Sequence, residues 1–121
     1  MAQHYKDLVA CQKAMDLVVE VYKASESFPR RETYSLTDQI RRAPVSVPSN
    51  IAEGQAHFSR GEFIHFLRHS SGSLAELETQ ILLAERLEYL PEIQAQSLLD
   101  RIHEVGRILS GLIGSLNRPA A

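Results

Sequence analysis

The stretch RRAPVSVPSNIAEG, residues 41–54, decides the fold because it places two prolines inside a segment with a helical pattern. Each of Pro44 and Pro48 lacks a backbone N–H and clashes with the carbonyl one turn earlier, at a cost of about 3 kcal/mol inside a helix. The apolar positions nevertheless keep helical spacing through both prolines, at Leu36, Ile40, Ala43, Val47 and Ile51. This unbroken hydrophobic phase predicts one kinked helix rather than two separate elements, and we expect Gly54 at or near its end.

Three further segments show the same spacing of apolar residues, so we predict helices at about residues 6–26, 35–55, 60–88 and 91–117. The predicted buried stripe of the first helix is Leu8, Cys11, Met15, Val18 and Tyr22. The stripe of the third helix is Phe63, Leu67, Ser70, Leu74, Leu77, Ile81 and Ala84. The stripe of the fourth helix is Leu98, Ile102, Val105, Leu109, Leu112 and Leu116.

Residues typical of helix ends support these limits. We expect Ser35 to cap the second helix, and Ser59 with Glu62 forms a capping-box pattern before the third. We expect Pro91 at the first position of the fourth helix, where its missing N–H is tolerated. Four long helices joined by short links predict an all-α, up-down-up-down four-helix bundle.

The 121 residues suit a single domain, 1–121, and are enough to bury a sizeable core. Cys11 is the only cysteine, so no intrachain disulfide can form, and its apolar neighbours indicate a small core residue. No segment resembles a signal peptide or a membrane span, so we expect a cytoplasmic protein that makes no membrane contact.

Apolar residues outside the predicted stripes widen the apolar faces of the second and third helices. They are Val45, Ile64, Phe66, Leu82 and Leu83. Such extra apolar surface favours burial against another subunit, so we expect a homo-oligomer. The alternative is a broad intramolecular core face.

Two polar stripes lie beside these apolar faces, and we interpret them as one structural polar network. Its predicted members are Arg42, Ser46, Asn50, Glu53, Gly72, Ser73 and Glu76. On this interpretation the network fixes helix register or subunit contacts. The alternative is a ligand-binding or catalytic site. We favour structure and predict that the chain is not an enzyme, because no nucleophile is paired with a base at a recognisable spacing.

Two short motifs resemble parts of metal sites. Glu62-x-x-His65 resembles the element found in di-iron bundles, and Asp100-x-x-His103 is a partial match. Both histidines lie off the apolar seams, so we predict no metal and no cofactor. His65 and His69 are one helical turn apart and could clamp a metal at the surface, although an exposed pair is the more common meaning of this spacing.

The formal net charge is −2, but residues 30–69 hold an excess of arginine. Six arginines are candidates for phosphate contacts with RNA or DNA: Arg30, Arg31, Arg41, Arg42, Arg60 and Arg68. The alternative is a solvated face or a set of ion pairs.

The segment LTDQIRRAPVSVPSNIAEG (36–54) followed by SRGEFIHFLRHSSGSLAELETQILLAERLEYL (59–90) resembles the 23S rRNA intervening-sequence protein family. The resemblance extends from Leu8 to about Leu116. The positions that match the family's motifs are Arg41, Arg42, Ser46, Asn50, Glu53, Gly54, Gly72, Ser73, Glu76 and Glu78. The resemblance implies a four-helix bundle that assembles as a barrel-like homopentamer.

A relative in this family is the accessory variability protein of diversity-generating retroelements, in which a basic surface binds nucleic acid and the protein partners a reverse transcriptase. The resemblance therefore implies a noncatalytic assembly that binds a nucleic acid or a nucleoprotein partner. The alternative is a protein–protein scaffold without nucleic-acid binding. The present sequence departs from the family in having Pro44, where a small helix former is more usual. It also departs from the strongly basic relative in its net charge of −2, which opposes phosphate binding unless arginines gather on one face.

Overall fold

The computed structural model describes residues 8–57 and 59–118. Within these ranges the chain forms α1 (Val9–Ser25), the short 3-10 helix η2 (Arg30–Glu32), α2 (Leu36–Ala56), α3 (Arg60–Arg86) and α4 (Glu92–Asn117). The described part of the chain has no strand, which confirms the all-α class. None of its helices combines the length and apolarity that crossing a bilayer requires.

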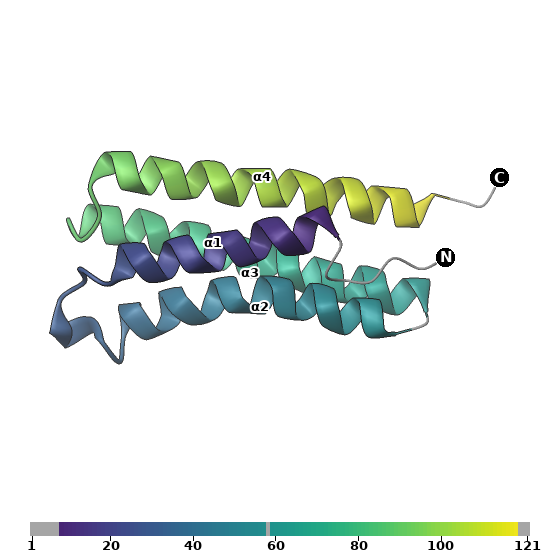
Figure 1. The fold of residues 1–121 in the computed structure, drawn as a ribbon, viewed down its shortest axis with the longest axis horizontal. Coiled ribbons are helices and arrows are strands. Elements are labelled where there is room, and N and C mark those ends of the chain that lie inside the picture. The colour runs from purple at the N-terminus through teal and green to yellow at the C-terminus, as the bar shows by residue number, and fades with distance from the viewer. Residues whose placement is uncertain (1–7, 58, 119–121) are drawn as a thin grey trace.

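The four helices lie side by side and alternate in direction (Figure 1). α2 packs against α1 and α3, and α4 packs against α3 and α1, so each helix contacts its two neighbours around the bundle. The α2–α3 pair has the most extensive contact. The chain is therefore an up-down-up-down four-helix bundle, as predicted.

The predicted stripes of α2, α3 and α4 form the core of the bundle. Their buried members are Ile40, Ala43, Val47, Ile51, Leu67, Ser70, Leu74, Leu77, Ile81, Ala84, Leu98, Ile102, Val105 and Leu109. Leu36, Phe63, Leu112 and Leu116 pack against this core while remaining partly exposed.

The predicted stripe of α1 was right at Cys11, which is buried, and at Leu8, which packs against the core, but wrong at Met15 and Tyr22. Met15 and Tyr22 are exposed at 41% and 42%, whereas the buried face of the helix contains smaller residues. That face consists of Ala10, Cys11, Ala14, Leu17 and Val21. α1 has apolar residues on several sides, so two phases fit the same spacing. The buried phase contains the alanines, because small side chains let α1 approach its neighbours closely.

α2 is continuous from Leu36 to Ala56 with both prolines inside it, which confirms the prediction of a single helix. Figure 1 shows this helix as one unbroken ribbon, and its kink stays a prediction. Polar side chains bond to carbonyls around the prolines. The Ser46 hydroxyl donates to the Ala43 carbonyl at 2.9 Å, and the Asn50 amide donates to the Ser46 carbonyl at 2.7 Å.

The helix ends agree with the sequence only in part. Ser59 caps α3, because its Oγ accepts the backbone N–H of Glu62 at 3.1 Å. Ser35 precedes α2, but its side chain makes no capping bond, so that prediction was wrong. The carboxylate of Glu32 performs this role, with Oε1 accepting the backbone N–H of Leu36 at 3.3 Å.

The turn between α3 and α4 also differs slightly from expectation. α3 ends at Arg86, and Glu88 has a left-handed φ of 62°, a conformation that often ends helices. Pro91 is the residue before α4 rather than its first residue, and the helix begins at Glu92.

Gly54 is buried where α2 crosses α3. A Cβ at this position would lie 2.9 Å from Phe63 Cδ1 and 2.9 Å from Phe66 Cβ, closer than carbon atoms pack. α2 continues past Gly54 to Ala56. The glycine therefore lies near the helix end, as expected, but its role is to let the two helices touch.

Arg41 connects α2 to the end of α1. Its Nε donates to the Ser25 hydroxyl at 2.7 Å, and its Nη2 donates to the Tyr22 carbonyl at 3.3 Å. The guanidinium also lies 4.8 Å from the centre of the Tyr22 ring. Arg42, the next residue, instead makes a 3.6 Å ion pair with Asp38 on the exposed surface of its own helix.

The Gly54→Ala variant should have a free energy of unfolding lower than wild type by about 1–3 kcal/mol, because the added methyl overpacks the α2–α3 contact. Gly72→Ala is the matched control, because Gly72 lies within α3 with no atom near the position of a Cβ. The control should stabilise the protein by about 0.5–1 kcal/mol, through helix propensity. Urea unfolding followed by circular dichroism measures both changes. Equal stabilities of the two variants would contradict this role for Gly54.

Arg41→Ala should destabilise the protein by about 1–3 kcal/mol, because it removes two hydrogen bonds and a cation–π contact. Arg42→Ala should change stability by less than about 0.5 kcal/mol, because it removes only an exposed ion pair within one helix. The same unfolding measurement compares the two. A larger loss from Arg42→Ala would show that the arginine that holds α1 to α2 has been misassigned.

Candidate functional site

The predicted polar network is formed in part, across the α2–α3 contact. The hydroxyls of Ser46 and Ser73 are hydrogen-bonded to each other, and Asn50 joins them through its bond to the Ser46 carbonyl. The sequence did not assign Ser70 to this network, although Ser70 is fully buried and donates to the Val47 carbonyl at 2.8 Å. The sequence did hold a signal for this bond, because Ser70 is a polar residue within an apolar stripe and a proline-containing helix leaves carbonyls without their usual partners.

The other predicted members do not join the network. Arg42 pairs with Asp38 on its own helix, and Glu76 accepts a 3.4 Å hydrogen bond from Gln80 on its own helix. Glu53 and Gly72 are exposed. The network is therefore a short seam of hydroxyl and amide groups between α2 and α3, with charged residues on the surface around it.

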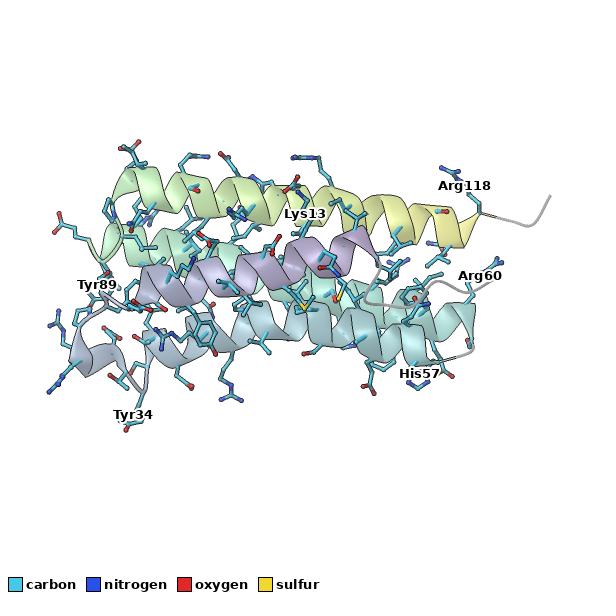
Figure 2. The ribbon with its side chains drawn as sticks, in the orientation of Figure 1. Lys13, Tyr34, His57, Arg60, Tyr89 and Arg118 are labelled. Carbon is cyan, nitrogen blue, oxygen red and sulfur yellow. The ribbon has the colours of Figure 1, made fainter. Side chains whose placement is uncertain are left out.

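The six candidate arginines lie at both ends of the bundle. Arg30 and Arg31 belong to η2, beside the first turns of α2. Arg60 begins α3 at the opposite end, which Figure 2 shows to be the end that also holds His57 and Arg118. Arg68 lies about two turns further along α3. The structure therefore does not gather the six side chains on one face.

Some of these arginines already have partners within the chain. Arg41 bonds to α1, as described above. Arg31 Nη2 lies 3.5 Å from the Tyr89 hydroxyl, and its guanidinium lies 5.9 Å from the centre of the Tyr89 ring. The Tyr89 hydroxyl donates in turn to Glu32 Oε2 at 2.8 Å. This end of the bundle is thus held together by contacts between η2 and the turn before α4.

The half of the bundle that holds η2 is acidic. It comprises residues 17–46 and 74–104, which contain eleven carboxylates and seven basic side chains. The carboxylates are Glu20, Glu26, Glu32, Asp38, Glu76, Glu78, Glu85, Glu88, Glu92, Asp100 and Glu104. A polyanion such as RNA or DNA is repelled from this half.

The other half, which we call the basic half, comprises residues 8–16, 47–57, 59–73 and 105–118. Its arginines are Arg60, Arg68, Arg107 and Arg118, and its carboxylates are Asp16, Glu53 and Glu62. None of the four arginines forms an ion pair with another described residue. Lys13 also lies in this half, where it pairs with Glu104 at 3.4 Å. Its five basic side chains against three carboxylates give the basic half a formal charge of +2, whereas seven against eleven give the acidic half −4.

The predicted di-iron-like motifs have other roles in the structure. Glu62 Oε2 lies 2.5 Å from His57 Nδ1, and Glu78 Oε1 lies 3.4 Å from His103 Nε2. No group of three or more histidine, cysteine, aspartate or glutamate residues among the described positions is arranged to hold a metal ion. Burial raises the pKa of the Cys11 thiol, which lowers its reactivity as a nucleophile.

Comparisons with known proteins agree with the observed fold. The family model for 23S rRNA-intervening sequence protein matches residues 6–111. A crystal structure from Bacteroides thetaiotaomicron, described as a protein with unknown function from the S23 ribosomal protein family, is similar with a TM-score of 0.78 and 26% sequence identity. That similarity covers 87% of this chain and 98% of the other. No curated protein matches the chain. The family match spans most of the sequence, so the chain belongs to the 23S rRNA-intervening sequence protein family.

Proposed function

We propose that this protein is a noncatalytic, self-assembling helical bundle that binds a nucleic acid or a nucleoprotein partner through its basic half. The observation that carries the proposal is the excess of positive charge there, where only three carboxylates accompany Lys13 and four arginines that form no ion pair, Arg60, Arg68, Arg107 and Arg118. Guanidinium groups that do not already form ion pairs can contact phosphates without first breaking a bond within the protein.

The charge distribution supports this placement of the partner. Arg30, Arg31, Arg41 and Arg42 were also candidates, but they lie in the acidic half, and Arg41 holds α1 to α2. A phosphate backbone is attracted to the basic half and repelled from the acidic half. By family resemblance the partner is RNA, DNA or a nucleoprotein such as a reverse transcriptase complex.

A noncatalytic role fits the chemistry of the described residues. The Cys11 thiol is buried, and His57 and His103 are each paired with a glutamate. The seam between α2 and α3 contains hydroxyl and amide groups that bond to one another or to backbone carbonyls. These bonds hold the helices together rather than activate a nucleophile.

Self-assembly is supported by exposed apolar side chains. Leu82 and Leu83 on α3 are 42% and 46% exposed, Leu87 just after its end is 49% exposed, and Val45 on α2 is 39% exposed. Exposed apolar surface is stabilised by burial against another subunit, at about 25 cal/mol per Å². We propose a homopentamer, the barrel-like state that the family resemblance implies.

A protein–protein scaffold without nucleic-acid binding is the second candidate. The same exposed leucines favour it, because an apolar surface binds protein whatever the distribution of arginines. The two candidates differ in their response to salt. Phosphate contacts weaken steeply as salt rises, whereas apolar contacts do not.

Fluorescence anisotropy with labelled structured RNA and duplex DNA, repeated over a salt series, tests nucleic-acid binding. Arg60→Ala/Arg68→Ala should weaken binding on every sequence and reduce the slope of log K against log salt by about 2, one for each lost phosphate contact. The matched control Arg30→Ala/Arg31→Ala removes two arginines from the acidic half and should leave the slope unchanged. Equal effects of the two double variants would contradict the basic half as the site. No binding by wild type at low salt would leave the scaffold candidate.

Light scattering coupled to size exclusion tests assembly. Wild type should have about five times the 13.6 kDa mass of one chain. Leu83→Glu should shift the protein toward monomer while it stays folded, because a buried unpaired charge is costly at an interface. Gln94→Glu is the control, since Gln94 is an exposed polar residue on α4, and it should leave the mass unchanged. A monomeric wild type would contradict self-assembly.

A further inference from the structure

Two histidines meet on the outer surface of α3. His65 and His69 are exposed and one helical turn apart, and their Nε2 atoms lie 3.2 Å from each other. The ring centres are 4.5 Å apart, with the planes inclined by 74°. The Nε2 atom of each ring therefore points toward the other ring rather than into solvent.

This separation is the one that two ligands of a single metal ion require. A zinc–imidazole bond is about 2.0–2.1 Å, so two nitrogens of a tetrahedral site lie about 3.3 Å apart. Histidines at positions i and i+4 on one helical face are an established way to supply two such ligands. We propose that His65 and His69 form a two-imidazole binding site for a divalent transition-metal ion.

The neighbouring rings hold His65 in place. The edge of the His65 ring meets Phe66, with ring centres 5.5 Å apart, and Phe66 stacks on His57 at 5.2 Å. His57 is itself bound to Glu62. Phe66 is in turn held by the close approach of α2 at Gly54. A ligand that is already ordered loses less side-chain entropy when it binds the ion, so this arrangement raises affinity.

Metal binding at this pair needs no net loss of protons. In the neutral metal-free pair, the Nε2–H of one ring donates to the Nε2 lone pair of the other. When the ion binds, the donor ring exchanges that proton with water and takes the Nδ1–H form. Both Nε2 lone pairs are then available to the ion, and each ring keeps one N–H.

The remaining coordination positions fall to water and to side chains around the pair. His65 and His69 line an open surface hollow of about 380 Å³ together with Arg68, Gly72, Ser73 and Glu76. The carboxylate of Glu76 offsets the charge of Arg68, which would otherwise oppose a cation. Imidazole ligands select copper, nickel and zinc over magnesium and calcium, with copper(II) bound most tightly.

Calorimetric titration with copper(II), nickel(II) and zinc(II) chlorides tests the site. All proteins in the comparison carry His4→Ala, so that a histidine near the chain terminus contributes no binding. The parent protein should bind one equivalent of each ion per chain, and magnesium should not bind. His65→Ala and His69→Ala should each weaken binding by about tenfold or more, since each removes one of two ligands, and tenfold corresponds to about 1.4 kcal/mol.

His103→Ala is the matched control, because His103 is an exposed histidine on α4 that is paired with Glu78. It should leave the affinity unchanged. The electron paramagnetic resonance spectrum of the copper(II) complex should show two equatorial nitrogens in the parent and one in either α3 variant, which separates a ligand role from a structural one. The absence of binding in the parent, or equal affinities in parent, His65→Ala and His69→Ala, would overturn the proposal. Neither result depends on whether the protein binds nucleic acid.

Discussion

The close contact between α2 and α3 is the constraint on which the rest of the structure depends. It requires a residue without a side chain at Gly54, because Phe63 and Phe66 occupy the space that a Cβ would take. The same contact brings α3 near a helix that contains two prolines. Two carbonyls of that helix accept side-chain hydrogen bonds, one from Ser70 on α3 and one from Asn50. The hydroxyl of Ser46 bonds to a serine hydroxyl of α3 across the seam. Tight packing and polar bonding thus occur along one interface, and together they fix the register of α2 against α3.

This contact also organises the side chains at the end of the bundle. Phe66 packs closely against Gly54 on α2, and its ring contacts the rings of His57 and His65. The short glycine-containing segment of α2 therefore sets the positions of surface histidines on α3, although it does not touch the His65–His69 pair through any bond. The family motif around residues 50–54 has a structural meaning here, which is to place aromatic rings on the neighbouring helix.

The sequence predicted the bundle well where its pattern allowed a single interpretation. The stripe of α2 kept its phase through Pro44 and Pro48, and the buried residues follow it. α1 was ambiguous, because Met15 and Tyr22 fit the same spacing as the alanines that are buried. The sequence also could not show which of two adjacent arginines contacts a neighbouring helix. Arg41 and Arg42 differ by about 100° around the helix, so one reaches α1 and the other faces solvent. Likewise, the spacing of His65 and His69 indicated proximity, but the 3.2 Å distance between their Nε2 atoms depends on the side-chain rotamers, which the spacing does not determine.

The uneven distribution of charge has a kinetic consequence. Carboxylates outnumber basic side chains in the half that holds η2, and basic side chains outnumber carboxylates in the other half, so the molecule has an electric dipole along its long axis. A dipole of this kind turns in the field of a distant charge before any contact is made. Near a polyanion the bundle would be oriented with its α2–α3 turn leading, so that productive encounters would form a larger share of collisions. This orienting torque, unlike affinity at contact, would fall off over the Debye length of about 8 Å at physiological salt.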